Sequence, residues 1–193
     1  MRHLPRILFI VGVIVLLGTF LVPIWSITLR APQYPHGVTM LIWINKLGGT
    51  EPGTLQNINI LNHYVGMKMV DPASIPELRY FPKIIVGMVV LGLIMGIFNN
   101  KYVWLIWVVI LLLLCLLGIY DFYTWLYDYG HNLAPDAPIK IPGQAYQPPL
   151  IGSKMLLNFK ATSLPHTGSI FIGLSLILTI GSFFLKRKLE TTT

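Results

Sequence analysis

Apolar residues gather in four long blocks along the chain, and polar segments of very different lengths separate them. The blocks cover residues 7–27, 83–98, 102–120 and 169–185. A helix needs about 20 apolar residues to cross a hydrocarbon core of roughly 30 Å, so each block is expected to form a transmembrane helix. The first block is longer than the roughly 7–15 apolar residues of a secretion signal, which favours an uncleaved anchor helix.

This pattern predicts an all-α membrane protein, in which a single integral membrane domain of residues 1–193 contains a four-transmembrane-helix bundle. Two long segments, residues 28–82 and 121–168, connect the helices on the same side of the membrane and are expected to form a small mixed α/β cap. The turn between the second and third blocks is very short. Most of the specific chemistry must therefore lie in the two long segments.

Shorter elements can be predicted within the two long segments. Residues 38–44 are β-branched and aromatic, as in a strand, and residues 55–67 are typical of a short helix. Residues 121–129 contain neither Gly nor Pro, so the third helix is expected to continue beyond the bilayer. The Pro-rich residues 132–149 predict irregular structure, and residues 154–162 fit either a strand or a short helix.

Small residues inside two of the blocks predict close packing of helices. Gly92 and Gly96 lie four residues apart in the second block, and Ser169 and Gly173 do so in the fourth. Such spacing lets the backbones of two helices approach closely. The pattern supports a bundle without identifying which helices form pairs.

Composition excludes a soluble globular domain, and the charges predict an orientation. Hydrophobic residues make up 54% and charged residues 11% of the chain, whereas soluble domains have about a quarter charged residues. Arg2, Arg6, Lys101 and residues 186–188 flank the blocks at ends that the positive-inside rule assigns to the cytoplasm, so both termini are expected there. Because the basic residues flank or separate apolar blocks, the net charge of +7 does not indicate a nucleic-acid partner.

Several kinds of chemistry have no support in the sequence. No Asp, Glu, Arg or His lies in the middle of any block, whereas ion-coupled transporters usually place such groups there. Motifs for a nucleophilic serine, a phosphate-binding loop or a zinc protease are missing. Cys115 is the single cysteine, so neither a disulfide nor a thiolate metal site is expected. We therefore predict a protein that is not itself an enzyme.

One pattern in the long segments suggests metal chemistry. His63 and Met67 are four residues apart in a predicted helix, so their side chains would share a face, and imidazole with thioether is a ligand set suited to copper. Asp128 and His131, three residues apart, form a second pair, and the fourth transmembrane helix is expected to bring His166 near. These five residues are the predicted metal ligands. Packing at the membrane-proximal surface is the more common role of such residues and stays the alternative.

Three stretches of the long segments are similar to those of a known family. They are Ala31-Pro-Gln-Tyr-Pro-His-Gly37, Ile58-Asn-Ile-Leu-Asn-His-Tyr-Val-Gly-Met67 and Gln147-Pro-Pro-Leu-Ile-Gly-Ser-Lys-Met-Leu-Leu-Asn-Phe159. They resemble a little-characterised group of small bacterial four-span inner-membrane proteins, some associated with the accessory genes of copper-dependent nitrous oxide reductase. The resemblance implies a bacterial inner-membrane location and a role in maturing or supplying a periplasmic copper enzyme, beside a copper lipoprotein and an ABC-type membrane complex. It assigns no catalytic or ligand residues.

Together these observations predict a non-catalytic inner-membrane accessory protein that binds copper, or a copper-carrying protein, through its outer segments. Its expected partners are the lipid bilayer and other membrane or periplasmic proteins. The alternative is a structural subunit of a larger respiratory or transport complex, in which the apolar outer surface is an interface. A membrane enzyme acting on a lipid or quinone has the least support, because no cluster of catalytic residues stands out at the membrane.

Overall fold

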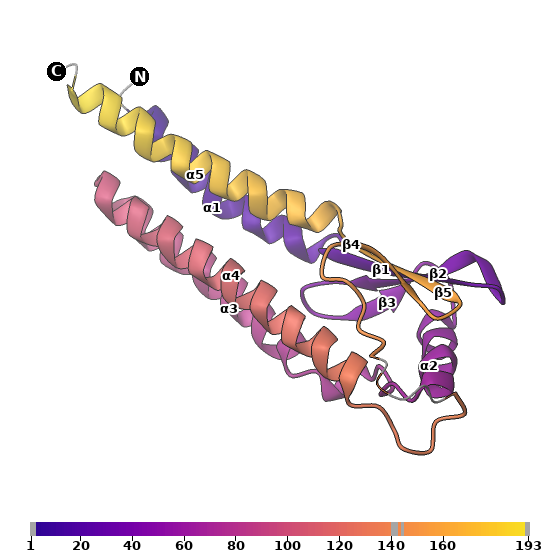
Figure 1. Ribbon diagram of the computed structural model, residues 1–193. Helices are drawn as coiled ribbons and strands as arrows, with labels where there is room; N and C mark the ends of the chain where they lie inside the picture. Colours follow the sequence, from indigo (N-terminus) through magenta and orange to yellow (C-terminus); the bar gives the residue numbers. More distant parts are fainter. Residues whose placement is uncertain (1–2, 140–142, 144, 192–193) are drawn as a thin grey trace.

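A set of long helices and a β-sheet at one end of them make up the protein (Figure 1). The computed structural model describes residues 3–139, 143 and 145–191. The start of α1 and the end of α5 lie together at the end of the helices that is farthest from the sheet (Figure 1). In chain order the elements are α1 (Leu4–Val15), η1 (Leu16–Phe20), β1 (Trp25–Ala31), β2 (Tyr34–Ile42), β3 (Leu47–Gly49), α2 (Thr54–Val65), η2 (Pro72–Ser74), α3 (Glu77–Ile97), α4 (Lys101–His131), β4 (Gly152–Leu156), β5 (Phe159–Pro165) and α5 (Thr167–Thr191).

The sheet makes this a mixed α/β protein, so the prediction of an all-α protein with a four-transmembrane-helix bundle is wrong. Strands come from both long segments, and β1 lies partly inside the first apolar block. In β1 and β5, residues with a buried side chain alternate with more exposed ones, as a half-buried strand requires. Residues 154–162, which fitted either a strand or a helix, form most of the β4–β5 hairpin.

Helices α3, α4 and α5 are long and apolar enough to cross a membrane, and they identify a membrane protein. The first apolar helix, Leu4–Phe20, is shorter. It ends well before residue 27, because Pro23 has no N–H for a further helical turn and β1 begins at Trp25. Helix α4 continues without interruption to His131, which confirms that the third helix extends beyond its apolar block.

The two halves of the chain meet in one antiparallel sheet of strand order β3-β2-β1-β5-β4. Strands β1 and β5 pair along their length, from Trp25 opposite Pro165 to Arg30 opposite Lys160. The N–H of Gly168 then donates to the carbonyl of Pro23 at 2.7 Å. Because η1 leads into β1 and α5 follows β5, this pairing places α1 and α5 side by side (Figure 1).

One face of the sheet, which we call the inner face, packs against α2 and the end of α4. Ile27 and Leu29 of β1, Met40 of β2 and Ala161 of β5 point to this side and are buried. Leu126 on α4 closes the same core at 1% exposure. The inner face, α2 and the end of α4 therefore form the cap, which has its own hydrophobic core.

Aromatic rings fill the space between the long helices. Trp104 and Trp107 of α4 are fully buried, and Phe9 of α1 stacks on Trp104 with ring centroids 5.1 Å apart. Each indole N–H donates to a carbonyl oxygen of the α3 segment, that of Trp107 to Met88 at 2.8 Å and that of Trp104 to Phe98 at 3.1 Å. These bonds satisfy the only polar atom of each indole where water is excluded.

Basic side chains join the helices at the end far from the sheet. Arg6 Nε donates to the carbonyl of Gly96 at 2.8 Å, and Lys186 Nζ donates to the carbonyl of Asn99. Lys101 forms an ion pair with Glu190. The last carbonyl groups of α3 lack helical partners, so cations from α1 and α5 are well placed to stabilise them.

Close helix packing confirms one of the two predicted small-residue patterns. A Cβ atom added at Gly92 would lie 2.6 Å from a methyl group of Val13, and one at Gly96 would lie 3.2 Å from Ile10, so both glycines face α1. Gly173 has no neighbour within 4 Å, so that half of the second pattern is wrong. On α5 the fully buried small residues are instead Ser175, Thr179 and Ser182, and Thr179 faces Gly12 of α1.

Replacing Gly92 with Ala should destabilise the protein, because the new methyl group would overlap Val13 and lie 2.7 Å from Trp107 Nε1. Overpacking of this kind costs about 1–3 kcal/mol. Gly87→Ala is the matched control on the same helix, since nothing lies within 4 Å of a Cβ there. Thermal unfolding in detergent, followed by tryptophan fluorescence, should give a lower Tm for Gly92→Ala only. Equal Tm values for the two variants would contradict the packing described.

Candidate functional site

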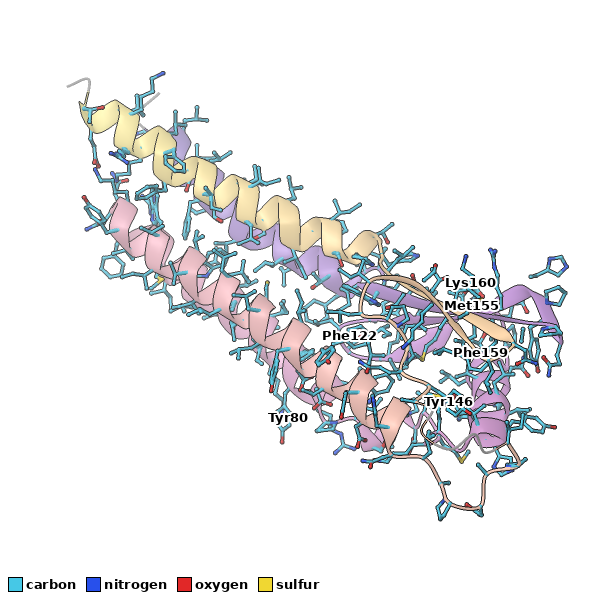
Figure 2. All side chains as sticks on the ribbon, viewed as in Figure 1. Tyr80, Phe122, Tyr146, Met155, Phe159 and Lys160 are labelled. Carbon is cyan, nitrogen blue, oxygen red and sulfur yellow. The ribbon has the colours of Figure 1, made fainter. Side chains whose placement is uncertain are left out.

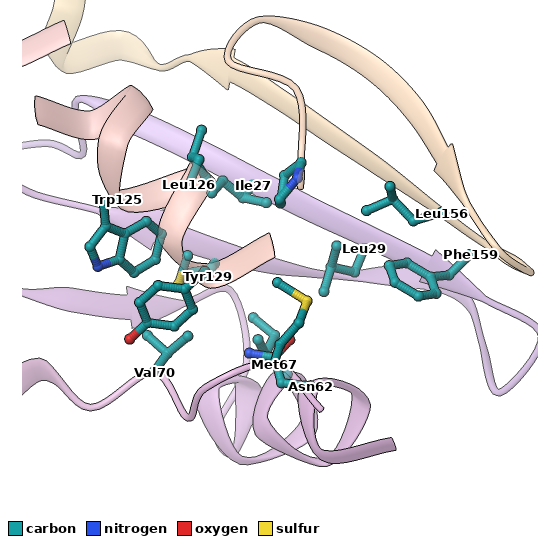
Figure 3. Close-up of a pocket in the computed structure, with 13 residues that line it drawn as sticks. Ile27, Leu29, Asn62, Met67, Val70, Trp125, Leu126, Tyr129, Leu156 and Phe159 are labelled. Carbon is teal, nitrogen blue, oxygen red and sulfur yellow. The ribbon is translucent and has the colours of Figure 1, made fainter. Parts of the chain in front are cut away.

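The cap contains a cavity of about 40 Å³ between the inner face, α2 and α4 (Figure 3). Such a volume has room for about one to three water molecules. Of its polar atoms, the Asn62 side-chain amide donates to the carbonyl of Lys68 at 3.1 Å, and the Tyr129 hydroxyl donates to the carbonyl of Met69 at 3.0 Å. The lining residues are Ile27, Leu29, Met40, Ile58, Asn62, Met67, Val70, Trp125, Leu126, Tyr129, Pro148, Leu156 and Phe159. Apart from the thioethers of its two methionines, the cavity offers little to a ligand.

His63 and Met67 do not share a helical face, because α2 ends at Val65. Gly66 adopts a left-handed conformation (φ 77°), and the N–H of Met67 donates to the carbonyl of Asn62 at 2.9 Å. This is a Schellman ending, which turns the chain away from the helix axis. As a result Met67 lines the cavity of the cap, while His63 stays exposed on α2.

The predicted pair Asp128 and His131 lies on the last turns of α4, where each side chain has another partner. Asp128 accepts a hydrogen bond from Lys68 Nζ at 2.6 Å and a second from the side chain of Asn132. The ring of His131 stacks on Tyr127 with centroids 3.9 Å apart, and its Nδ1 lies 2.9 Å from the Tyr127 carbonyl. The contact of Lys68 with Asp128 does bring the segment after α2 to the end of α4.

His166 lies apart from the other four predicted ligands. It follows β5 at the start of α5, and its N–H donates to the carbonyl of Ile24 at 3.0 Å. Among the residues that the structure describes, no group of three or more His, Cys, Asp and Glu side chains is close enough to hold a metal ion. The copper site at His63, Met67, Asp128, His131 and His166 therefore stays a prediction.

The side of the sheet opposite α2 and α4, which we call the outer face, is the feature that sequence reasoning missed. No helix of the described chain covers it (Figure 1). The alternation in β1 and β5 is its sequence signal, but in β1 that signal begins inside the apolar block predicted to cross the membrane. Its residues are Ser26, Thr28 and Arg30 of β1, Gly37, Thr39 and Leu41 of β2, Ser153 and Met155 of β4, and Lys160, Thr162 and Leu164 of β5.

The outer face changes in character from one end to the other. Leu41, Ser26 and Leu164 form a partly apolar row next to the helices. A row of hydroxyl groups follows, in which Thr28 and Thr39 are 2.9 Å apart and Ser153 and Thr162 are 2.8 Å apart. The last row, at the far end of the strands, contains Met155, Lys160 and Arg30. Figure 2 shows Met155 and Lys160 on the side away from α2, and Phe159 on the side toward it.

Comparison with protein families, with curated proteins and with solved structures finds no match to this chain.

The Schellman ending should be essential for the shape of the cap. Gly66→Ala combines the cost of a left-handed residue, roughly 1–2 kcal/mol, with a Cβ atom only 2.7 Å from that of Ala137. Gly53→Ala, at the other end of α2, is the matched control, because its φ of 80° is as strained but its Cβ meets only Gln56 Oε1 at 3.4 Å. Hydrogen exchange of the α2 amides should speed up more in Gly66→Ala. The same rate in both variants would show that contact with Ala137 contributes nothing.

Proposed function

We propose that the protein is a non-catalytic accessory subunit of a larger membrane assembly, whose cap is the contact site for a partner protein. The observation on which this rests is the outer face of the sheet, where Lys160 and Met155 are exposed and no described helix packs. Antiparallel sheets commonly have one face packed on a core and the other exposed to water. Docking is favoured here because the sheet is rigidly attached to helices that are themselves apolar enough to lie in a membrane.

The mounting of the cap supports a docking role. Only four residues separate η1 from β1 and one separates β5 from α5, and Ser169 Oγ donates to the carbonyl of Ile24 at 2.6 Å where they join. On the other side, Trp25 contacts Phe122 of α4 with ring centroids 5.4 Å apart. A sheet tied to the helices in this way presents its outer face in one orientation, which lowers the entropy cost of binding.

The charge distribution supports an orientation with the cap outside the cytoplasm, while the resemblance of the outer segments is what implies a bacterial inner membrane. Arg6, Lys101 and Lys186 gather at the end of the helices far from the sheet. Under the positive-inside rule that end is cytoplasmic, with both termini there. The first helix, Leu4–Phe20, would cross with α5 as a fourth span, because its α-helical and 3-10 turns together reach about 28 Å.

Copper supply to a periplasmic enzyme is the second candidate function. The observation that favours it is the pair of thioethers, from Met40 and Met67, that line the same cavity of the cap. Thioether sulfur is a soft ligand that suits Cu(I). Trp125 and Tyr129 line this cavity too, and an aromatic face attracts a cation.

Mild detergent extraction of the tagged protein from its own membranes tests the subunit proposal. We expect a fixed set of neighbouring membrane proteins at constant stoichiometry. Thr162→Trp, in the middle of the outer face, should remove them because the ring would occupy the contact surface. Ile60→Trp, at a 49% exposed position on α2, is the matched control and should retain them. A protein that purifies alone, or loses partners equally in both variants, would contradict the proposal.

Copper titration separates the second candidate from the first. Stoichiometric Cu(I) binding that weakens by about tenfold or more in Met40→Ala and in Met67→Ala, the two thioethers of the cavity, would support copper supply; tenfold corresponds to about 1.4 kcal/mol. His36→Ala and Met155→Ala are the matched controls, since both residues are exposed on strands of the sheet. Metal content at background in the purified protein, together with equal behaviour of all four variants, would leave only the subunit proposal.

A further inference from the structure

The outer face has the chemistry of a site for one particular kind of partner. We propose that it binds an extended, carboxylate-rich segment of another polypeptide, laid across β4, β5, β1 and β2. This inference rests on the proposed accessory function and names the chemistry of its partner.

Two positively charged side chains lie next to each other on the outer face. Arg30 and Lys160 are opposite each other on neighbouring strands and both are exposed. Like charges in this position are unfavourable unless an anion lies between or above them. None of the strands in the described chain contains Asp or Glu. The ion pairs found among the described residues involve Lys68, Lys101 and Lys186, so the two outer-face cations have no acidic partner there.

Arg30 lies next to a glycine on the neighbouring strand β2. The register between β1 and β2 shifts between Leu29 and Ala31, and Gly37 on β2 has a φ of 86°. A Cβ atom at Gly37 would lie 3.0 Å from Arg30 Cγ and 3.5 Å from its Nε. The arginine side chain therefore lies along the sheet over a position that has no side chain. Against β5 the register of β1 is unbroken through Arg30, so strand alternation keeps this side chain on the outer face, and the bulge on β2 places Gly37 next to it.

The hydroxyl groups of the outer face can donate further hydrogen bonds. Within each hydroxyl pair, Thr28 with Thr39 and Ser153 with Thr162, one hydroxyl donates to the other. The accepting hydroxyl of each pair keeps its own O–H for another acceptor. Together with the guanidinium of Arg30 and the ammonium of Lys160, these hydroxyls make the outer face mainly a donor of hydrogen bonds. A ligand rich in acceptors and negative charge, such as a run of Asp or Glu side chains, is the complement of this surface.

The shape of the face favours an extended polypeptide segment over a small molecule or a second copy. Three strand spacings of about 4.8 Å and four residues along a strand give a flat area of roughly 14 Å by 14 Å, and small ligands prefer concave sites. A second copy would place Arg30 and Lys160 against the same cations.

The position of the cations also argues against a lipid headgroup. The partly apolar row with Ser26 and Leu164 is nearest the helices, and Arg30 lies four residues farther along β1. At about 3.4 Å per residue, the cations are about 14 Å farther from the membrane end than that row. This exceeds the Debye length of about 8 Å at physiological ionic strength, so headgroup charges would act on them only weakly.

Peptide binding to the full-length protein in neutral phosphatidylcholine nanodiscs tests the proposal. The probe is a synthetic 12-residue peptide of alternating Glu and Thr, and the reference probe has Gln in place of each Glu. Calorimetric titration should detect the Glu peptide, with an affinity that falls as salt is raised, and little binding of the Gln peptide. Arg30→Glu and Lys160→Glu should each raise Kd by about tenfold or more.

Lys154→Glu is the matched control variant. Lys154 has the same charge and lies in the same hairpin, but it is opposite Ala161, on the alternation of the inner face. Its Kd should stay within about twofold of the unchanged protein; a twofold change is only about 0.4 kcal/mol. Arg30→Gln and Lys160→Gln serve as further variants where charge reversal disturbs folding, which circular dichroism will show.

Besides a lack of binding of the Glu peptide, four results would overturn the proposal. They are equal binding of the Glu and Gln peptides, an equal loss in Lys154→Glu, competition by inorganic phosphate at the concentration of the peptide, and equal, Arg30-dependent binding of phosphatidylglycerol vesicles. The last two would indicate a simple anion site or a lipid contact. If partners purify with the protein but no acidic peptide binds, the accessory function survives and this assignment of the partner's chemistry fails.

Discussion

The antiparallel pairing of β1 with β5 is the interaction on which the rest of the structure depends. It joins residues 130 to 140 positions apart in sequence, from Arg30 with Lys160 to Trp25 with Pro165. Because β1 follows η1 after four residues and α5 begins two residues after β5 ends, one ladder of hydrogen bonds sets the relative position of α1 and α5 and of the cap. Contacts of such long range are formed only after a costly loop closure, so the pairing requires support from the core beneath it.

That core explains why the two faces of the sheet have such different roles. Leu126 and the aromatic residues at the end of α4 cover the inner face together with α2, and they leave a cavity of about 40 Å³. The long projection of α4 beyond its apolar part makes this possible, since it brings Trp125 and Tyr129 to the level of the strands. With that side filled, hydroxyl groups and cations are left on the outer face.

Part of the fold could be predicted from the sequence, since local patterns determine it. Three of the four apolar blocks correspond to long helices, and the absence of Gly and Pro in 121–129 correctly predicts the extension of α4. The first block misled the prediction, because Trp25 and Ile27 continue the apolar run of the helix before them. Periodicity cannot separate a helix from a following strand at such a junction, where Pro23 alone marks the change.

The candidate sites show the same division. Composition alone argued against a soluble domain, because 11% charged residues is less than half of the roughly 25% found in soluble proteins. The spacing of His63 and Met67 indicated a shared face, but the left-handed Gly66 sends Met67 into the cap core. Side-chain periodicity is a local property that the chain encodes residue by residue. Which strands pair, which face is covered, and that Arg30 comes to lie beside Lys160 depend on contacts between distant segments, and only the tertiary structure decides them.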